Sequence, residues 1–279
     1  MSIDKEKSSL SAWKESAPYW AQYAGTIRTM FAPITSALIE DAGISPGQKV
    51  LDVAGGSGEP SLSIASMVAP GSVFYTDAVH EMAMATRRSA VDRNLTSLDF
   101  TQCIGEQLPF PRGSFDVVVS RLGVMLFNDP ASAIREMLRV AKTNGRVAMA
   151  VWSTSRANPF FSVVSDVVSR YVAPTPEDPD APGAFRFAEP GKLAGLVGEL
   201  GGKNVNEHLL QFTLEAPIDP RRFWELRSQM SETLRTKLAT LSTDSLSQLA
   251  KDVEDAGAPY YEAGRMTFPA EVWIVSTTA

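Results

Sequence analysis

The chain has 279 residues, enough for one large domain or one domain with a sizeable insertion, and its 44% hydrophobic content permits a globular core. The net charge of −6 and the pI near 5.1 argue against nucleic acid as a partner, because binding along a phosphate backbone needs a basic surface. The single cysteine excludes an internal disulfide, and the two histidines lack metal-ligand spacing, so we expect no metal site. We find neither a leader-like apolar segment nor a spanning helix, and therefore expect a cytoplasmic protein without a membrane partner.

Apolar side chains recur at helical spacing from Ser8 to Ala42 and predict two helices. Three aromatic residues of the first helix, Tyr19, Trp20 and Tyr23, could pack against a sheet or line a lid over a ligand site. Both alternatives stay open, and we expect residues 1–43 to form an N-terminal helical lid.

Residues 49–62, KVLDVAGGSGEPSL, predict a buried strand, a glycine turn and a helix start without a break. Pro60 fits the first turn of a helix that continues to Val68, because that turn needs no amide donor. This arrangement places a ligand at the carboxyl end of a sheet, although a tight turn without a ligand is the alternative. The glycines that let the backbone approach a ligand are Gly55, Gly56 and Gly58.

The residues around the turn indicate which ligand it binds. A dinucleotide fingerprint would carry a third glycine at Ser61, and its pyrophosphate needs free amide donors at the helix start. Pro60 removes one donor and Glu59 adds negative charge, so both disfavour a pyrophosphate. Asp52 and Glu59 flank the turn and suit a ligand with an amine and a positive centre, which describes S-adenosylmethionine better than NAD.

A second predicted strand, residues 71–77, ends in Asp77, 19 positions beyond Gly58. A carboxylate there can accept hydrogen bonds from both ribose hydroxyls of an adenosine. The alternative is that Asp77 caps the helix predicted over residues 79–93. We expect His80, in the first turn of that helix, to be exposed, and it remains a minor candidate for a base.

Further strands are predicted over residues 98–103, 115–120 and 146–152, with a helix over residues 130–141. The alternation of strands and helices predicts an α/β fold with a doubly wound, Rossmann-like sheet. The end of the strand over residues 115–120 points to the same crevice as the glycine turn.

Four stretches occur in the order and spacing of a known family: VLDVAGGSGEP, FYTDAVHEM, GEQLPF and FDVVVSRLGVMLFNDP. On these stretches, residues 48–152 resemble a class I S-adenosylmethionine-dependent methyltransferase of the small-molecule group that includes the quinone-biosynthesis enzymes. The resemblance implies that the Gly55 to Gly58 backbone meets the methionine portion and Asp77 the ribose. It also implies that Ala78 and Ile104-Gly105 flank the adenine, and that Ser120 or Arg121 lies beside the methionyl group.

The chain departs from this family at Ile104, where the family often has an aspartate that accepts from the adenine amino group. Ile104 can only pack or use its backbone. Glu106 matches the family pattern, and the alternative is a structural carboxylate in the loop. Arg121 could pair with the cofactor carboxylate or hold the loop through an ion pair.

The C-terminal half carries two further predicted strands, residues 205–214 and 266–277, and in the family such a pair completes a seven-stranded sheet with the last strand antiparallel. Between them, residues 219–257 form a helical insertion, which either packs as ordinary helices or joins the N-terminal helices as a substrate-selecting cap. We therefore expect one domain, 1–279, whose cofactor-binding core spans residues 44–152 and whose C-terminal half spans residues 153–279.

Three arginines of the insertion invite an anionic-substrate hypothesis, although helix surfaces usually carry such charges in solvent: Arg221, Arg222 and Arg227.

The predicted function is methyl transfer from S-adenosylmethionine to an O, N or C atom of a small, aromatic or quinonoid metabolite. In-line displacement can rest on positioning, so a dedicated catalytic residue is not required. If an acceptor proton must be removed, the candidates are His80, Tyr19 and Tyr23. The alternatives are an NAD-dependent oxidoreductase and a catalytically silent cofactor-binding module. The sequence does not indicate an oligomeric state.

Overall fold

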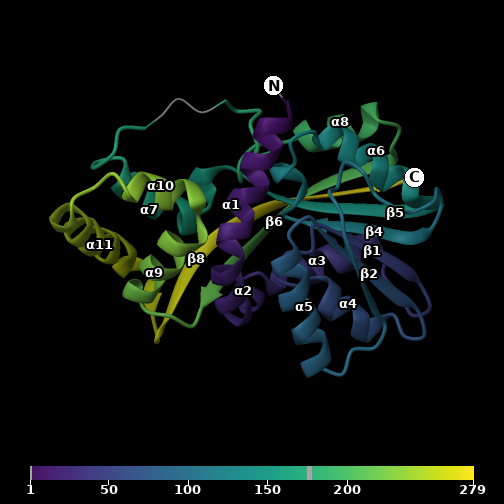
Figure 1. The fold of residues 1–279 in the computed structure, drawn as a ribbon, viewed down its shortest axis with the longest axis horizontal. Coiled ribbons are helices and arrows are strands. Elements are labelled where there is room, and N and C mark those ends of the chain that lie inside the picture. The colour runs from purple at the N-terminus through teal and green to yellow at the C-terminus, as the bar shows by residue number, and fades with distance from the viewer. Residues whose placement is uncertain (1, 175–177) are drawn as a thin grey trace. The chain divides into compact units, whose positions relative to one another are not determined.

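The computed structural model describes residues 2–174 and 178–279 (Figure 1). Residues 1 and 175–177, which fall in the predicted N-terminal lid and C-terminal half, lie outside the described residues. The chain forms two compact units. The helical unit comprises residues 1–31, 154–178 and 211–271, and the sheet unit comprises residues 32–153, 179–210 and 272–279.

The sheet has the strand order β3-β2-β1-β4-β5-β8-β6. The pairs β1/β2, β1/β4, β2/β3 and β4/β5 are parallel, and β8 runs antiparallel to β5. The predicted fold class is thereby confirmed, including the antiparallel last strand. The long strands are β1 (Lys49–Val53), β2 (Ser72–Asp77), β3 (Leu98–Gln102), β4 (Phe115–Arg121), β5 (Ala141–Trp152), β6 (Lys203–Ala216) and β8 (Arg265–Thr278).

An eighth strand, β7 (Tyr261–Glu262), pairs with the start of β8. A seven-stranded sheet was expected, and this addition was missed because two residues are too short to show a strand period. β5 begins at Ala141 instead of residue 146, since its ladder with β4 resumes beyond an irregularity between Phe115 and Val117.

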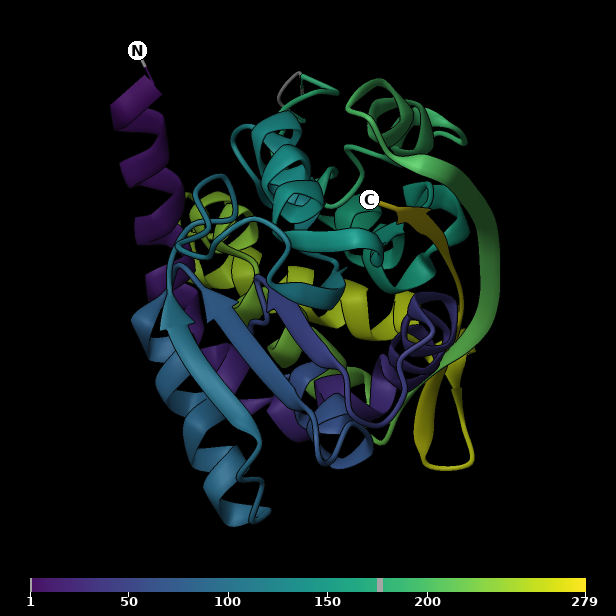
Figure 2. The same cartoon turned by 90° about the vertical axis from the view of Figure 1, so that its right-hand side faces the viewer.

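β1 lies in the interior of the sheet and aligns the elements that follow it. Leu51 pairs with Phe74 of β2 and with Val118 of β4, and Val50, Leu51 and Val53 are buried. A strand with neighbours on both edges and helices on both faces reads as a nearly continuous apolar run, as this one does. Figure 2 shows β1, β2 and β3 side by side, so their carboxyl ends meet at one edge.

Helices cover both faces of the sheet, with α3, α4 and α5 on one side and α6 and α8 on the other (Figure 1). α6 begins where the Asp129 carboxylate accepts a hydrogen bond from the Ser132 amide at 3.0 Å. The helices of this unit are α3 (Ala32–Ala42), α4 (Ser61–Met67), α5 (His80–Asp92), α6 (Pro130–Val140) and α8 (Lys192–Glu199), with the 3₁₀ turn η1 (Val124–Leu126).

In the helical unit, α9 packs against α1, α10 and α11, and α7 packs against α11. Its core is aromatic: the ring centroid of Phe223 lies 5.0 Å from that of Phe268 and 5.7 Å from that of Phe160. The elements are α1 (Ser2–Gln22), α2 (Ala24–Met30), η2 (Ser155–Ala157), α7 (Pro159–Val168), α9 (Pro220–Met230), α10 (Glu232–Leu238), α11 (Thr243–Gly257) and η3 (Ala258–Tyr260).

The prediction of two helices over Ser8 to Ala42 is wrong, because α1, α2 and α3 are three helices. The chain turns at Tyr23 and at Phe31, both buried, so the apolar period continues across each break and hides it. Within the described parts of the chain, no helix has both the length and the apolar character needed to cross a membrane.

Candidate functional site

The glycine turn follows β1 in a backbone conformation that side chains resist. Gly56 has a φ of 53° and Gly58 a φ of 106°, in the left-handed region that glycine adopts most easily. At Gly55 a Cβ would lie 2.4 Å from Cε2 of Tyr75 and 2.9 Å from Oδ2 of Asp52. The turn therefore favours glycine for two reasons: there is no room for a Cβ at Gly55, and Gly56 and Gly58 have positive φ angles. Pro60 immediately precedes α4 instead of lying in its first turn.

Three side chains hold the turn at Gly56. Its amide donates to Oδ2 of Asp77 at 2.9 Å, while its carbonyl accepts from the Tyr75 hydroxyl at 2.7 Å and the Thr86 hydroxyl at 3.0 Å. Sequence reasoning missed Tyr75 and Thr86. A buried strand tyrosine needs a hydroxyl partner, which is a usable signal, but nothing in the sequence marks Thr86.

Asp77 ends β2 and is buried, with Oδ1 accepting from the Val79 amide at 2.8 Å. Burial raises the pKa of this carboxyl above its ordinary value, opposed by hydrogen bonds from the amides of Val79 and Gly56. A carboxylate has about four acceptor positions, so these two bonds leave room for ribose hydroxyls. Asp77 thus also steadies the start of α5, and its ribose role stays a prediction.

Asp52, on β1, is fully buried, and its Oδ2 accepts from the Ser61 hydroxyl at 2.7 Å. Its Oδ1 has no hydrogen-bond partner among the described residues. Burial raises the pKa of Asp52 to about 7, although the Ser61 hydrogen bond and the charge of Arg121 favour the carboxylate. An orphaned carboxylate oxygen beside a glycine turn suits a ligand that brings an amine and a positive charge.

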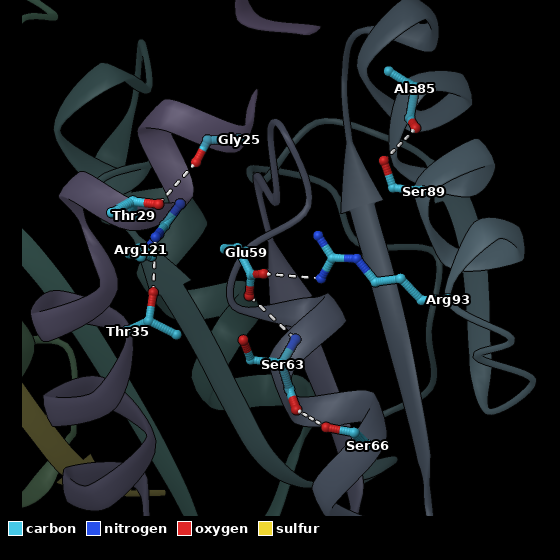
Figure 3. A network of polar contacts seen from close by, with 10 residues as sticks. All are labelled: Gly25, Thr29, Thr35, Glu59, Ser63, Ser66, Ala85, Ser89, Arg93 and Arg121. Carbon is cyan, nitrogen blue, oxygen red and sulfur yellow. Dashed lines mark hydrogen bonds and ion pairs between the residues drawn. The ribbon is translucent and has the colours of Figure 1, made fainter. Parts of the chain in front are cut away.

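Glu59 is engaged elsewhere. Its side chain is 4% exposed, its Oε1 lies 3.4 Å from Nη1 of Arg93, and its Oε2 accepts from the Ser63 amide at 3.1 Å (Figure 3). Glu59 therefore connects the turn to α4 and to the end of α5. These contacts disfavour the expectation that the Glu59 carboxylate faces the ligand. The sequence did not indicate Arg93 as its partner.

Arg121, at the end of β4, is half-buried and donates from Nη1 to the Thr35 hydroxyl of α3 at 2.8 Å (Figure 3). Burial lowers the pKa of this guanidinium to about 10, opposed by the charges of Glu59 and Asp52. This contact is a hydrogen bond to a neutral hydroxyl and not the predicted ion pair, so the role of Arg121 stays a prediction. Oγ of the preceding Ser120 is buried and has no partner among the residues described here.

The segments expected to flank the adenine follow β2 and β3. The Ala78 carbonyl accepts from the Gln102 side-chain amide at 3.0 Å, and Ile104 is half-buried. At Gly105, a Cβ would lie 2.7 Å from Cζ of Phe127, so a larger residue would have to displace that ring. Oε1 of Glu106 accepts from the Asp129 amide at 3.3 Å, which favours its structural reading.

Together, the carboxyl ends of four neighbouring strands bring the predicted residues to one edge of the sheet. Their assignment to cofactor binding remains a prediction. The residues are Asp52, Gly55, Gly56, Gly58, Asp77, Ala78, Ile104, Gly105, Glu106, Ser120 and Arg121.

The three base candidates lie in different settings. His80 is exposed at the start of α5, as expected. Tyr19, in the helical unit, has the Arg235 guanidinium 5.3 Å from its ring centroid. Tyr23 is buried and donates to the Gln229 side chain at 2.8 Å, and burial raises the pKa of its hydroxyl. Because a phenol must first lose its proton to act as a base, this shift opposes such a role for Tyr23.

Comparison with known proteins gives consistent findings. The profile described as "Methyltransferase domain" matches residues 51–149. An uncharacterised protein of Mycobacterium tuberculosis (strain ATCC 25618 / H37Rv) is 30% identical over 202 residues, which cover 71% of each chain. The ubiquinone/menaquinone biosynthesis C-methyltransferase of Ectopseudomonas mendocina is 37% identical over 133 residues, 47% of this chain and 52% of that enzyme.

Solved structures share the fold. The YcgJ protein of Bacillus subtilis superposes with a TM-score of 0.56 at 18% identity, covering 88% of this chain and 97% of that one. Phosphoethanolamine N-methyltransferase 2 of Haemonchus contortus, in complex with S-adenosyl-L-methionine, gives a TM-score of 0.54 at 16% identity, covering 88% and 52%. At these identities the likeness concerns the fold alone.

Proposed function

The chain belongs to the class I S-adenosylmethionine-dependent methyltransferases, and from this premise we propose that its acceptor is a small aromatic or quinonoid metabolite, methylated at an O, N or C atom. The 37% identity with a quinone-biosynthesis C-methyltransferase supports this choice of acceptor. The observation that carries the assignment of the site is the glycine turn, fastened at Gly56 and flanked by the buried carboxylates of Asp52 and Asp77.

We assign cofactor binding to the edge that these residues share. The Gly55 to Gly58 backbone and the unpartnered Oδ1 of Asp52 would meet the methionine portion, and Asp77 would accept from the ribose hydroxyls. Ala78, Ile104 and Gly105 would flank the adenine. When bound, S-adenosylmethionine supplies a methyl group activated by a positively charged sulfur.

The residues of the site act mainly by holding reactants in place. Holding well-oriented reactants together lowers the activation barrier by roughly 7–11 kcal/mol, which is a large part of the barrier to displacement on an activated carbon. The three contacts at Gly56 fix the turn before a ligand arrives, so little ordering remains for binding. Burial of Asp52 keeps water from the oxygen that we assign to the amine.

We also propose that residues 1–43 and 219–257 select the acceptor. Helix α1 packs against α9 and α10, so α1 and the insertion belong to the same helical unit, whereas α3 packs on the sheet. Two long-range hydrogen bonds support this: Tyr23 donates to Gln229 at 2.8 Å, and Arg235 donates to the Ser16 hydroxyl at 2.9 Å.

The cofactor assignment is tested by thermal unfolding with S-adenosylmethionine, S-adenosylhomocysteine, NAD or no ligand. A ligand at 100 times its dissociation constant adds about 2.7 kcal/mol, which shifts the midpoint by several degrees. We expect a shift with both adenosyl ligands that Asp77→Ala abolishes and that Asp99→Ala, an exposed change on β3, leaves intact. A shift with NAD alone would overturn the assignment of the site.

The acceptor is tested by incubating the protein with S-adenosylmethionine that carries a labelled methyl group and a panel of phenols, catechols and quinols. We expect label in at least one aromatic product. Label found only in aliphatic amines or in nucleic acid would refute the proposed acceptor class. Tight cofactor binding with no methylated product from any class would instead favour a catalytically silent module.

A further inference from the structure

The first residue of α4, Ser61, holds the carboxylate of Asp52. The Ser61 hydroxyl donates to Oδ2 of Asp52 at 2.7 Å, and both residues are fully buried within the sheet unit. Oδ1 of Asp52 has no hydrogen-bond partner among the residues that the structure describes. A dinucleotide turn would carry glycine where Ser61 stands, so it would lack this hydroxyl. Ser61 therefore fixes one oxygen of the carboxylate and leaves the other unbonded.

The charge of Asp52 depends on opposing effects. Burial disfavours the carboxylate and raises the pKa of Asp52 to about 7, and the strongest opposing effect is the hydrogen bond from the Ser61 hydroxyl. The charge of Arg121 on β4 and the Ser61 amide also favour the carboxylate, whereas the charge of Asp77 on β2 opposes it. Without the Ser61 hydroxyl, Asp52 would be largely neutral near pH 7.

Two further groups around Asp52 keep one protonation state near pH 7. Burial raises the pKa of the Tyr75 hydroxyl well above its ordinary value, so this phenol stays neutral. Burial lowers the pKa of the Arg121 guanidinium to about 10, and the charge of Glu59 opposes that effect, so Arg121 stays charged. Asp52 therefore titrates beside a neutral phenol and a charged guanidinium.

Asp52 lies directly behind the glycine turn. A Cβ added at Gly55 would lie 2.9 Å from Oδ2 of Asp52, so the carboxylate is a close neighbour of the backbone that we assign to the methionine portion. Protein interiors screen charge poorly, so an ionised carboxylate in this position attracts a ligand ammonium group, whereas a neutral carboxyl group does not. The charge of Asp52 therefore sets how tightly the turn holds a ligand with an amine.

We propose that Ser61 is a positioning residue for the cofactor, because its hydroxyl holds Asp52 as the carboxylate that attracts the cofactor amine. This inference rests on the proposed function and deepens it, since Ser61 lies outside the residues predicted to bind the cofactor. Binding of the ammonium group ionises Asp52, and the proton of its carboxyl group passes to the solvent. Affinity should therefore rise with pH until Asp52 is ionised in the free protein, and then level off.

The test is calorimetric titration of the full-length protein with S-adenosylhomocysteine at about pH 6, 7 and 8. Since the pKa of Asp52 is about 7, the wild-type affinity should rise about tenfold from pH 6 to pH 8. Ser61→Ala removes a hydrogen bond to the ionised form, so the rise should move up by about one pH unit, and affinity at pH 7 should be about fivefold below that of wild type.

Three further variants show which group is responsible. Ser61→Thr keeps the hydroxyl and should retain the wild-type profile, whereas Asp52→Asn should give a flat profile. Ser66→Ala removes an exposed hydroxyl of the same helix and is the matched control, which should behave as wild type. If Ser61→Ala loses stability but keeps the wild-type pH profile of binding, Ser61 has a purely structural role and the inference is overturned.

The matched ligand is 5′-methylthioadenosine, which has the nucleoside of S-adenosylhomocysteine but no amine. Its affinity should be the same at all three pH values. An equal pH dependence for both ligands, or a dependence that persists in Asp52→Asn, would assign the titration to another group, such as Asp77, and would refute the role of Ser61.

A second measurement uses the wild-type protein alone and does not depend on the folding of variants. Titration with S-adenosylhomocysteine in buffers of different ionisation enthalpy counts the protons released on binding. We expect release of about 0.9 proton at pH 6 and about half a proton at pH 7. Binding without proton release at either pH contradicts the inference.

The same titrations separate this inference from the proposed function. If S-adenosylhomocysteine binds with one affinity at all three pH values, the role of Ser61 is refuted and the proposed cofactor site stands. If it binds at none of them, the proposed function fails and the role of Ser61 fails with it.

Discussion

The double contact to the Gly56 carbonyl predicts a measurable coupling between Tyr75 and Thr86. Tyr75→Phe removes the 2.7 Å donor and Thr86→Val removes the 3.0 Å donor, each with little change in shape. Either single change leaves the carbonyl with its other donor, so each should destabilise the protein by about 0.5–1.5 kcal/mol. The double variant leaves that carbonyl with neither donor.

The size of the coupling follows from the exposure of the turn. An orphaned buried carbonyl costs about 1–3 kcal/mol, and since Gly56 is half-buried, where water can replace part of the lost bonding, the lower end applies. We therefore expect the double variant to lose about 1 kcal/mol more than the two single variants together. Because Gly56 also orders the proposed cofactor site, the double variant should lose a similar free energy, about 1 kcal/mol, in its binding of S-adenosylhomocysteine.

The assay is a double-mutant cycle on the free energy of unfolding in urea, repeated on the dissociation constant of S-adenosylhomocysteine. Independent sites add to within roughly 0.3–0.5 kcal/mol, which sets the resolution of the cycle. Losses that add within that margin would refute the view that both hydroxyls serve one carbonyl. Ser66, whose hydroxyl donates within α4 on an exposed surface, supplies a control as Ser66→Ala paired with Tyr75→Phe.

Three further outcomes are expected. Burial raises the pKa of Asp52 in the folded protein from 3.8 to about 7, so the unfolded chain loses this proton at a lower pH than the folded protein does. The free energy of unfolding should therefore fall as pH rises from about 4 to about 7, by up to roughly 4 kcal/mol. Urea unfolding of Asp52→Asn should show a flatter profile over that range, and parallel profiles would count against a buried, raised carboxyl. Gly55→Ala should prevent binding of S-adenosylhomocysteine, because its Cβ would lie 2.4 Å from the Tyr75 ring. The Cβ of Gly56→Ala meets no atom within 4 Å, so this variant should cost only about 1–2 kcal/mol of backbone strain. Equal losses of S-adenosylhomocysteine binding in calorimetry would contradict the steric argument. Arg93→Gln removes the partner of the Glu59 side chain, which is 4% exposed. Since Arg93 itself is 34% exposed, the change should cost about 1–2 kcal/mol of stability in thermal unfolding. Arg88→Gln is the control and should cost little, and an equal loss in both variants would contradict the ion pair.

Most of the fold could be predicted from local sequence patterns. The apolar run that predicts β1 and the three glycines after it are adjacent in the chain, and Asp77 ends the next predicted strand. Strand and helix patterns therefore place Asp52, Gly55 and Asp77 at one sheet edge. The prediction failed where the end of a helix has no signal in the local sequence. Tyr23 and Phe31 continue the apolar period through two helix ends, and two predicted helices became three.

The remaining details of the site depend on contacts between distant parts of the chain. Glu59 and Arg93 are 34 positions apart, and Arg121 and Thr35 are 86 positions apart, so no short-range pattern records either contact. Helix phase does carry a signal for Arg227. It follows Leu226 and lies one turn after Phe223, both buried, which separates it from the exposed Arg221. The contact of Arg227 with Phe160 and Phe161 of α7 joins distant segments, so no short-range pattern records it.

The position of β8 in the sheet has a consequence for biosynthesis. β8 lies between β5 and β6, yet it is the last of these strands to leave the ribosome. Until residues 265–278 emerge, the inner edges of β5 and β6 have no partner, and unpaired edges recruit other strands. The nascent chain is thus exposed to misassembly until β8 pairs with β5 and β6.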